Sequence, residues 1–205
     1  MQIIPQATII TPNQYEAELL SGSKISTEDE AWKVMTHLHD KGPQTVVITS
    51  LDPSVSGENQ IVLLVSRRRV NSNDVPLYDR VRAVASRIPT YFTGTGDLLS
   101  ALLLARLHEF PSSSGLDGLV KAMTMALASL QAVMRETVKH CPKEALHATM
   151  RTSAVARERE LRLVQSQHAI SVPPVEDMPD IKVEALLDCQ SLKKEETISD
   201  SNGVA

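Results

Sequence analysis

The sequence predicts an α/β fold with a parallel β-sheet, and three consecutive segments near its start carry that prediction. Ala7–Ile10 and Thr45–Ile48 are short apolar runs rich in β-branched residues, which is typical of buried strands. Between them, helical spacing of apolar residues predicts a helix with one buried face, formed by Ala31, Val34, Met35 and Leu38. A helix that connects two such strands forms a β-α-β unit, whose strands run parallel.

Capping signals place the first two helices. Asn13 followed by Glu16 fits an N-cap with an acidic residue three positions later, so we expect a short helix over Gln14–Leu20. The next helix has two candidate capping boxes within Ser26–Glu30, one starting at Ser26 and one at Thr27.

The middle of the chain is expected to hold two more strands and two more helices. Ile61–Val65 is an apolar run that favours an antiparallel or edge strand. Val81–Ile88 shows a weak alternation of apolar and polar residues, which indicates one more strand. The charged stretch Arg67–Asp79 between them is typical of a solvated connection. Leu98–Ala105 is apolar on nearly all sides, which predicts a buried helix, and Leu116–Val138 has the pattern of a long amphipathic helix. A short surface helix over residues 157–167 is also expected.

Composition excludes several classes of protein. The chain has 205 residues, 42% of them hydrophobic, and a net charge of −4, which argues against a basic nucleic-acid-binding surface. The run Leu98–Ala105 is too short to cross a bilayer, and Met1–Pro5 has no features of a signal peptide. Two cysteines, Cys141 and Cys189, favour a reducing compartment, so we expect a cytoplasmic protein without nucleic-acid or membrane partners.

A glycine-rich turn stands directly before the predicted buried helix, in the run Gly94-Thr95-Gly96-Asp97. Glycines let a backbone approach a ligand closely, and the free N–H groups of a helix start attract anions such as phosphate. Asp97 would lie in the first turn, where it could take a proton from an attacking hydroxyl. The alternative is an ordinary loop with an acidic helix cap. A P-loop signature is absent, and a dinucleotide fingerprint would need glycine in place of Leu99.

Polar residues also follow the two predicted parallel strands. Asn13 and Glu16 come after the first strand, and Thr49 and Ser50 come after the second. Because ligands of open α/β sheets bind at the carboxyl ends of the strands, these residues would face one crevice. Taken alone, Asn13 and Glu16 are better explained as a capping box.

Four motifs resemble pyridoxal kinase, a family of the ribokinase-like superfamily. They occur in the family's order, within about residues 4–187, as Ile10–Leu20, Thr45–Ser50, Phe92–Leu98 and Glu160–Ser166. The Gly-Thr-Gly-Asp run alone would indicate only the superfamily, which also includes sugar and hydroxymethylpyrimidine kinases. The Thr-Pro-Asn-Gln-Tyr-Glu-Ala-Glu and Leu-Val-Gln-Ser runs are similar to the pyridoxal branch.

This resemblance implies a ribokinase-like α/β fold with a mostly parallel sheet flanked by helices. It also implies ATP-dependent phosphorylation of the 5′-hydroxymethyl group of pyridoxal, pyridoxine or pyridoxamine, the reaction of vitamin B6 salvage that forms pyridoxal 5′-phosphate. Asp97 resembles the catalytic base at the vitamin, and Gly94, Thr95 and Gly96 resemble the anion hole over the transferred phosphoryl group.

The resemblance further assigns nucleotide and cation contacts. Glu16 resembles a carboxylate of the Mg²⁺ region, which would hold Mg²⁺ or another divalent cation, and Thr11 and Thr49 resemble positions near a monovalent cation, K⁺ or Na⁺. The residues that resemble ATP contacts are Asn13, Thr49, Ser50, Ile88, Thr90 and Thr95.

One departure from the family concerns length. Family members carry a large portion before the Thr-Pro-Asn motif, with the first strands and much of the vitamin pocket, whereas about ten residues precede it here. We therefore expect residues 1–187 to form the C-terminal, nucleotide-binding portion without the N-terminal strands, and residues 188–205 to be a disordered tail. The alternative function is a catalytically impaired isoform that binds nucleotide or forms a homodimer.

Overall fold

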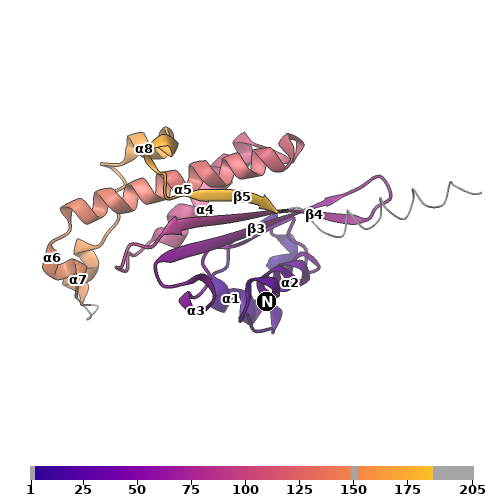
Figure 1. Ribbon diagram of the computed structural model, residues 1–205, viewed down its shortest axis with the longest axis horizontal. Coiled ribbons are helices and arrows are strands. Elements are labelled where there is room, and N and C mark those ends of the chain that lie inside the picture. The colour runs from indigo at the N-terminus through magenta and orange to yellow at the C-terminus, as the bar shows by residue number, and fades with distance from the viewer. Residues whose placement is uncertain (1–2, 149–151, 187–205) are drawn as a thin grey trace, which may run out of the picture.

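The computed structural model describes residues 3–148 and 152–186, and its centre is a five-stranded mixed sheet (Figure 1). The strands lie side by side in chain order: β1 (Ile9–Ile10), β2 (Thr45–Ile48), β3 (Gln60–Val70), β4 (Pro76–Ser86) and β5 (Lys182–Leu186). β1 and β2 are parallel, which confirms the predicted β-α-β unit, but the other three pairings are antiparallel. The expectation of a mostly parallel sheet is therefore wrong for the described residues, because β3 and β4 form a hairpin and β5 runs back along β4.

Helices cover both faces of this sheet. Figure 1 shows α1, α2 and α3 on one face and α4, α5 and α8 on the other. The α-helices are α1 (Gln14–Ser21), α2 (Glu28–His39), α3 (Pro53–Ser56), α4 (Thr95–Glu109), α5 (Gly115–His140), α6 (Lys143–Leu146), α7 (Ser153–Glu158) and α8 (Gln167–Ser171). Three short 3₁₀ helices are η1 (Ile4–Gln6), η2 (Ser112–Ser114) and η3 (Val175–Asp177).

Alternation along β3 builds two hydrophobic cores. Val62 and Leu64 point to the cluster under α1 and α2, whereas Leu63 and Val65 belong to the cluster under α4 and α5. Successive side chains of a strand point to opposite faces, so a continuous apolar run is needed where both faces are covered.

The predicted helix caps are present. Asn13 Oδ1 accepts the backbone N–H of Glu16 at 2.9 Å, and Glu16 Oε2 accepts the N–H of Asn13 at 2.9 Å. For α2, the capping box is the one that starts at Thr27, with Glu30 as its acidic partner. These reciprocal bonds satisfy N–H groups that have no partner inside the helix.

The charged stretch Arg67–Asp79 is not the solvated connection that its composition favours. β3 continues to Val70 and β4 begins at Pro76, and the side chains of Arg67 and Asp79 are each only 3% exposed. Arg67 donates to Asp79 across the strand pair and to the carbonyl of Gly115. Charged residues can be buried when they pair in this way, so composition alone misplaced the strand ends.

The helix α4 is buried on one face only. Leu99, Leu102 and Leu103 pack into the core, but Leu104 is 63% exposed and Ala101 is exposed as well. The expectation that this helix is buried all round is wrong, because α4 lies near β1, the edge strand of the described sheet.

The segment after α7 is less helical than expected. α7 ends at Glu158, and Thr93 forms an isolated parallel bridge with Glu160. The expected tail, residues 188–205, and the domain end at residue 187 lie outside the described residues.

One stretch within the described residues, Ser112–His140, is long and apolar enough to cross a membrane by length and composition. Of its most apolar window, 61% is buried inside the protein. Core helices of globular proteins pass the same test, and α5 contributes Leu119, Met123 and Leu127 to the core.

A buried histidine makes stability depend on pH. The His39 ring is completely buried, with Nδ1 2.9 Å from the carbonyl oxygen of Pro43 and Nε2 2.9 Å from Ser66 Oγ. A carbonyl only accepts, so Nδ1 carries the proton and Nε2 accepts from the Ser66 hydroxyl. Burial lowers the pKa of His39, against the opposing effect of the Pro43 carbonyl.

We expect the free energy of unfolding to fall as the pH drops below about 6.5, the pKa of an unfolded histidine. Below that pH the histidine binds a proton in the unfolded chain but stays neutral in the folded chain. The loss of free energy of unfolding therefore grows until the pH reaches the lowered pKa of His39 in the folded chain. Urea titrations across this range would measure it, and His39→Gln should flatten the profile. His37→Gln, at an exposed position of the same helix, should leave the slope unchanged; an identical slope in all three proteins would contradict this account.

Candidate functional site

The largest set of predicted site residues lies around one cavity of about 280 Å³. It opens where the end of β2, the segment after β4 and the start of α4 meet one face of α5. Six predicted residues line it, from three separate parts of the chain: Thr49, Ser50, Ile88, Thr90, Thr95 and Gly96. The structure therefore brings together most of the residues assigned to the nucleotide.

The wall of this cavity formed by α5 and the strands is apolar. Leu127, Leu130 and Met134 project from one stripe of α5, and Leu63 and Ala85 come from β3 and β4. Ligand sites are commonly apolar clefts with a few polar groups at defined points. A flat ring fits against such a wall, while a charged group would be held at the polar rim.

The glycine turn supplies that rim. Gly94 is the N-cap of α4 with φ 87° and ψ 5°, a left-handed conformation that favours glycine, and no side chain caps this helix. The first N–H groups of α4 therefore lack the side-chain partners found at α1 and α2. A Cβ added at Gly96 would meet nothing within 4 Å, so space lies open above the turn. Free N–H groups, a helix dipole and open space are the features that favour anion binding at a helix start.

Hydrogen bonds connect this turn to the end of β1. Ser100 Oγ donates to the carbonyl of Gly96 at 2.8 Å, so the hydroxyl of Thr11 is the donor in its 3.0 Å contact with Ser100. The parallel bridge between Thr93 and Glu160 joins the same turn to the Leu-Val-Gln-Ser segment. Motifs far apart in the chain thus meet around the start of α4.

The ends of the two parallel strands also bind each other. The N–H of Thr49 donates to the carbonyl of Pro12 at 2.9 Å, and the N–H of Gln14 donates to the carbonyl of Ser50 at 3.2 Å. These bonds fix the polar strand ends next to one another, as the carboxyl ends of parallel strands should be.

Some predicted residues lie outside the cavity. Asn13 and Glu16 form the cap of α1, while Thr11 and Glu16 line a separate groove of about 400 Å³ beside β1. Asp97 is exposed in the first turn of α4, next to Gly96, which does line the cavity. The structure thus supports the capping role of Asn13 and Glu16 and places Asp97 beside the cavity rather than in its wall.

Glu16, the residue predicted to contact a divalent cation, lies outside the cavity, in the capping box of α1. Within residues 3–148 and 152–186 there is no cluster of three or more His, Cys, Asp or Glu side chains that could hold a metal. Mg²⁺ is usually bound by one or two carboxylates together with substrate phosphates. The capping box uses Oε2 of Glu16, which leaves its Oε1 outside that pair of bonds.

Several polar cavity residues were missed by sequence analysis, among them Arg87 and Gln131. Arg87 lines the cavity just after β4, and Gln131 lines it from the apolar stripe of α5. A glutamine between Leu127 and Met134 interrupts an otherwise apolar face, which was the available signal. Arg87 gave none, because single arginines near strand ends are common.

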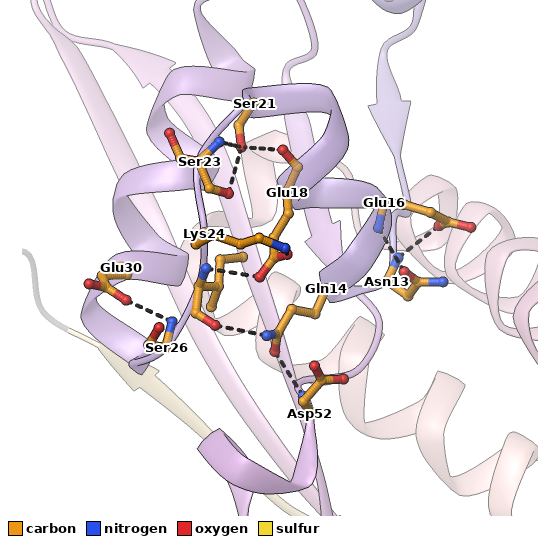
Figure 2. Close-up of polar contacts among 11 residues, drawn as sticks. Asn13, Gln14, Glu16, Glu18, Ser21, Ser23, Lys24, Ser26, Glu30 and Asp52 are labelled. Atoms are coloured by element: carbon orange, nitrogen blue, oxygen red, sulfur yellow. Dashed lines mark hydrogen bonds and ion pairs between the residues drawn. The ribbon is translucent and has the colours of Figure 1, made fainter.

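The buried side-chain amide of Gln14 contacts the backbone of a residue that lines the cavity. Gln14 is 4% exposed; its Nε2 donates to the carbonyl of Ile25 at 2.8 Å, and its Oε1 accepts the N–H of Asp52 at 2.8 Å (Figure 2). Glu18, one turn further along α1, accepts the N–H of Ile25 at 3.0 Å and pairs with Lys24. Gln14 thereby ties α1 to the loop before α2 and to Asp52, which lines the cavity.

We expect Gln14→Leu to lower the free energy of unfolding by roughly 1–3 kcal/mol, because two backbone groups lose their partner. The N–H groups of Leu51 and Asp52 should also exchange faster with deuterium. Urea titration and hydrogen exchange would measure both effects. Gln6→Leu, at an exposed glutamine, is the matched control and should change neither. Unchanged exchange at Asp52 in Gln14→Leu would contradict the assigned role.

Comparison with known proteins identifies a family and relatives of similar sequence. The sequence model of the phosphomethylpyrimidine kinase family matches residues 1–140. Pyridoxal kinase of Homo sapiens is 41% identical over 175 residues, which cover 85% of this chain and 54% of that protein.

Solved structures show a similar fold. The pyridoxal kinase of Leishmania donovani in complex with ADP has a TM-score of 0.72 and 24% identity, covering 91% of this chain and 54% of that one. The Plasmodium falciparum PdxK with the ligands AMP-PNP and PL has a TM-score of 0.63 and 26% identity, covering 90% of this chain and 52% of that one.

These similarities confirm the ribokinase-like α/β fold predicted from the motifs. The chain spans about half the length of the curated relatives it matches. Pyridoxal kinases of other animals and of Arabidopsis thaliana match over the same share of the chain. The chain therefore belongs to the phosphomethylpyrimidine kinase family.

Proposed function

We propose that this chain binds ATP in the cavity and transfers its γ-phosphoryl group to the 5′-hydroxymethyl group of a B6 vitamer, forming pyridoxal 5′-phosphate from pyridoxal. The observation that carries the proposal is the meeting of Thr49, Ser50, Thr95 and Gly96 around one cavity beside Asp97. Names of relatives support it: the Leishmania donovani protein was solved with ADP, and the Plasmodium falciparum protein with AMP-PNP and PL.

Each part of the site has a role in this reaction. The apolar wall of α5 takes the base, and the polar ends of β2 and the segment after β4 take the sugar and phosphates. The N–H groups at the start of α4 hold the transferred phosphoryl oxygens, where negative charge must be stabilised. Asp97 accepts the proton of the vitamer hydroxyl as that oxygen attacks phosphorus.

Cations complete the charge balance of the proposal. Glu16 would contribute a carboxylate to Mg²⁺ or another divalent cation, and the hydroxyls of Thr11 and Thr49 lie near the strand ends where K⁺ or Na⁺ would bind. A divalent cation supplies neutralisation of the phosphate charge. The chain's own residues orient the nucleotide so that the γ-phosphoryl group faces the Asp97 side of the cavity.

A second candidate function is nucleotide binding without transfer, by the chain alone or as a homodimer. The observation that favours it is the cavity, which is lined by five of the six residues assigned to ATP. The residues proposed for the nucleotide are within the described part, whereas the acceptor vitamer has a single assigned contact, Asp97. We place either function in the cytoplasm, consistent with the expected reducing compartment.

One experiment separates the candidates. The full chain is incubated with ATP, Mg²⁺ and pyridoxal, and pyridoxal 5′-phosphate is measured by chromatography, alongside ATP affinity by calorimetry. Product formation that depends on ATP supports the kinase. ATP binding without product supports the second candidate, and a folded chain that does neither refutes both.

A further inference from the structure

A buried amide oxygen in the cavity wall lacks a partner. Gln131, on α5, is 2% exposed and lines the cavity. Its Nε2 donates to the carbonyl of Ser86, the last residue of β4, at 3.1 Å. Its Oε1 is buried and has no hydrogen-bond partner among the described residues. A buried acceptor without a donor is unfavourable, so a ligand that brings an N–H group would relieve it.

The contact with Ser86 determines which end of the amide is available. The carbonyl of Ser86 can only accept, so Gln131 must direct its NH₂ group there and leave its oxygen for the ligand. Turning the amide over would place two oxygens against each other. The oxygen is enclosed by protein atoms, so contact requires a small rotation about the last side-chain torsion, which is a soft one.

We propose that Gln131 is a specificity-determining residue whose Oε1 accepts a hydrogen bond from the exocyclic amino group of the nucleotide base. The site would therefore prefer 6-aminopurine nucleotides to 6-oxopurine nucleotides. This inference rests on the proposed function, because it assumes that a nucleotide occupies the cavity. It extends that function by naming the residue that selects the base.

The groups that purine bases carry at C6 support a preference for adenine over guanine and hypoxanthine. Adenine presents an N–H donor at C6, whereas guanine and hypoxanthine present a carbonyl oxygen at that position. A carbonyl facing Oε1 would leave two acceptors unpaired in an apolar wall formed by Leu127, Leu130 and Met134. The bond to Ser86 prevents the amide from inverting to accommodate it.

The test compares nucleotide affinities of the full chain by calorimetry. Wild type should bind ATP about tenfold more tightly than GTP or than the triphosphate of purine riboside, which lacks the amino group. Gln131→Met, similar in shape but without the amide, should lose most of that preference by binding ATP more weakly. Its affinity for GTP should stay within about twofold.

Ser129→Ala is the matched control on the same helix. Ser129 is also fully buried and donates to a distant backbone carbonyl, that of Ala169 in α8 at 2.6 Å, but it does not line the cavity. This variant should lose stability and keep the wild-type preference for ATP.

Each outcome decides the matter. Equal wild-type affinities for ATP and for the purine riboside triphosphate would overturn the inference and leave nucleotide binding intact. An unchanged preference in Gln131→Met would also overturn it. Should that variant fail to fold, the wild-type comparison of the two triphosphates still decides. A folded wild type that binds neither triphosphate would refute the proposed function itself, and this inference with it.

Discussion

Replacing Asp97 with asparagine should lower the turnover of pyridoxal phosphorylation by roughly two to four orders of magnitude, the usual contribution of a general base. The amide keeps the size and hydrogen-bonding reach of the carboxylate but cannot accept the hydroxyl proton at neutral pH. Asp97 is exposed in the first turn of α4, so the substitution should disturb packing little.

ATP affinity should change far less than turnover in this variant. The N–H groups at the start of α4 are backbone groups and remain in place, so they still hold the phosphates. Loss of a negative charge beside the triphosphate could tighten binding slightly. The measurement is kcat together with ATP affinity for both proteins.

Asp117→Asn provides the control for a general helix effect. Asp117 is also an exposed acid in the first turn of a helix, α5, and neither lines the cavity nor follows the glycine turn. Its removal should leave kcat unchanged. Nearly normal turnover in Asp97→Asn would remove Asp97 from catalysis, and loss of folding together with ATP binding would favour its interpretation as a helix-cap residue.

The largest loss of stability is expected from Asp79→Ala. Asp79 accepts hydrogen bonds from Arg67 at 3.2 Å and from Arg69 at 2.6 and 2.7 Å. Removing the carboxylate leaves the buried guanidinium of Arg67 without a counter-charge, which typically costs about 3–5 kcal/mol. Because whole domains are stable by only about 5–15 kcal/mol, much of this variant should be unfolded at 37 °C.

Two further variants test the cause. Arg69→Met removes the half-exposed partner and should cost at most about 1 kcal/mol. The double variant with Asp79→Leu and Arg67→Met replaces the buried pair with apolar groups and should recover part of the loss. Urea titration measures all of them. A loss in Asp79→Ala no larger than in Arg69→Met would contradict the role of the buried charge.

Local signals were sufficient to predict the starts of α1 and α2 and the glycine turn before α4. The capping residues Asn13 and Thr27 mark helix starts because they satisfy N–H groups within one turn, and no distant contact is needed to see this. The Gly94–Gly96 turn was equally visible, because glycine readily adopts the left-handed conformation found at Gly94.

Features that depend on distant partners could not be predicted. Arg67 and Asp79 lie on different strands, so neither segment alone shows that their charges neutralise each other and extend the hairpin. The role of Gln131 could not be predicted either, because its partner, the carbonyl of Ser86, lies 45 residues earlier in the chain. The exposed face of α4 could not be predicted either, because its exposure depends on the position of α4 beside β1, the edge strand of the described sheet.

Hydrogen exchange with and without MgATP tests the central claim, that this chain binds a nucleotide in the cavity between the end of β2 and the start of α4. Saturating MgATP should slow exchange at backbone N–H groups in Thr49–Asp52 and Thr93–Asp97, with protection also near Gln131. Protection confined to another surface, such as the groove lined by Trp32, His37 and Tyr78, would contradict it. So would a folded chain whose exchange is unchanged by millimolar MgATP.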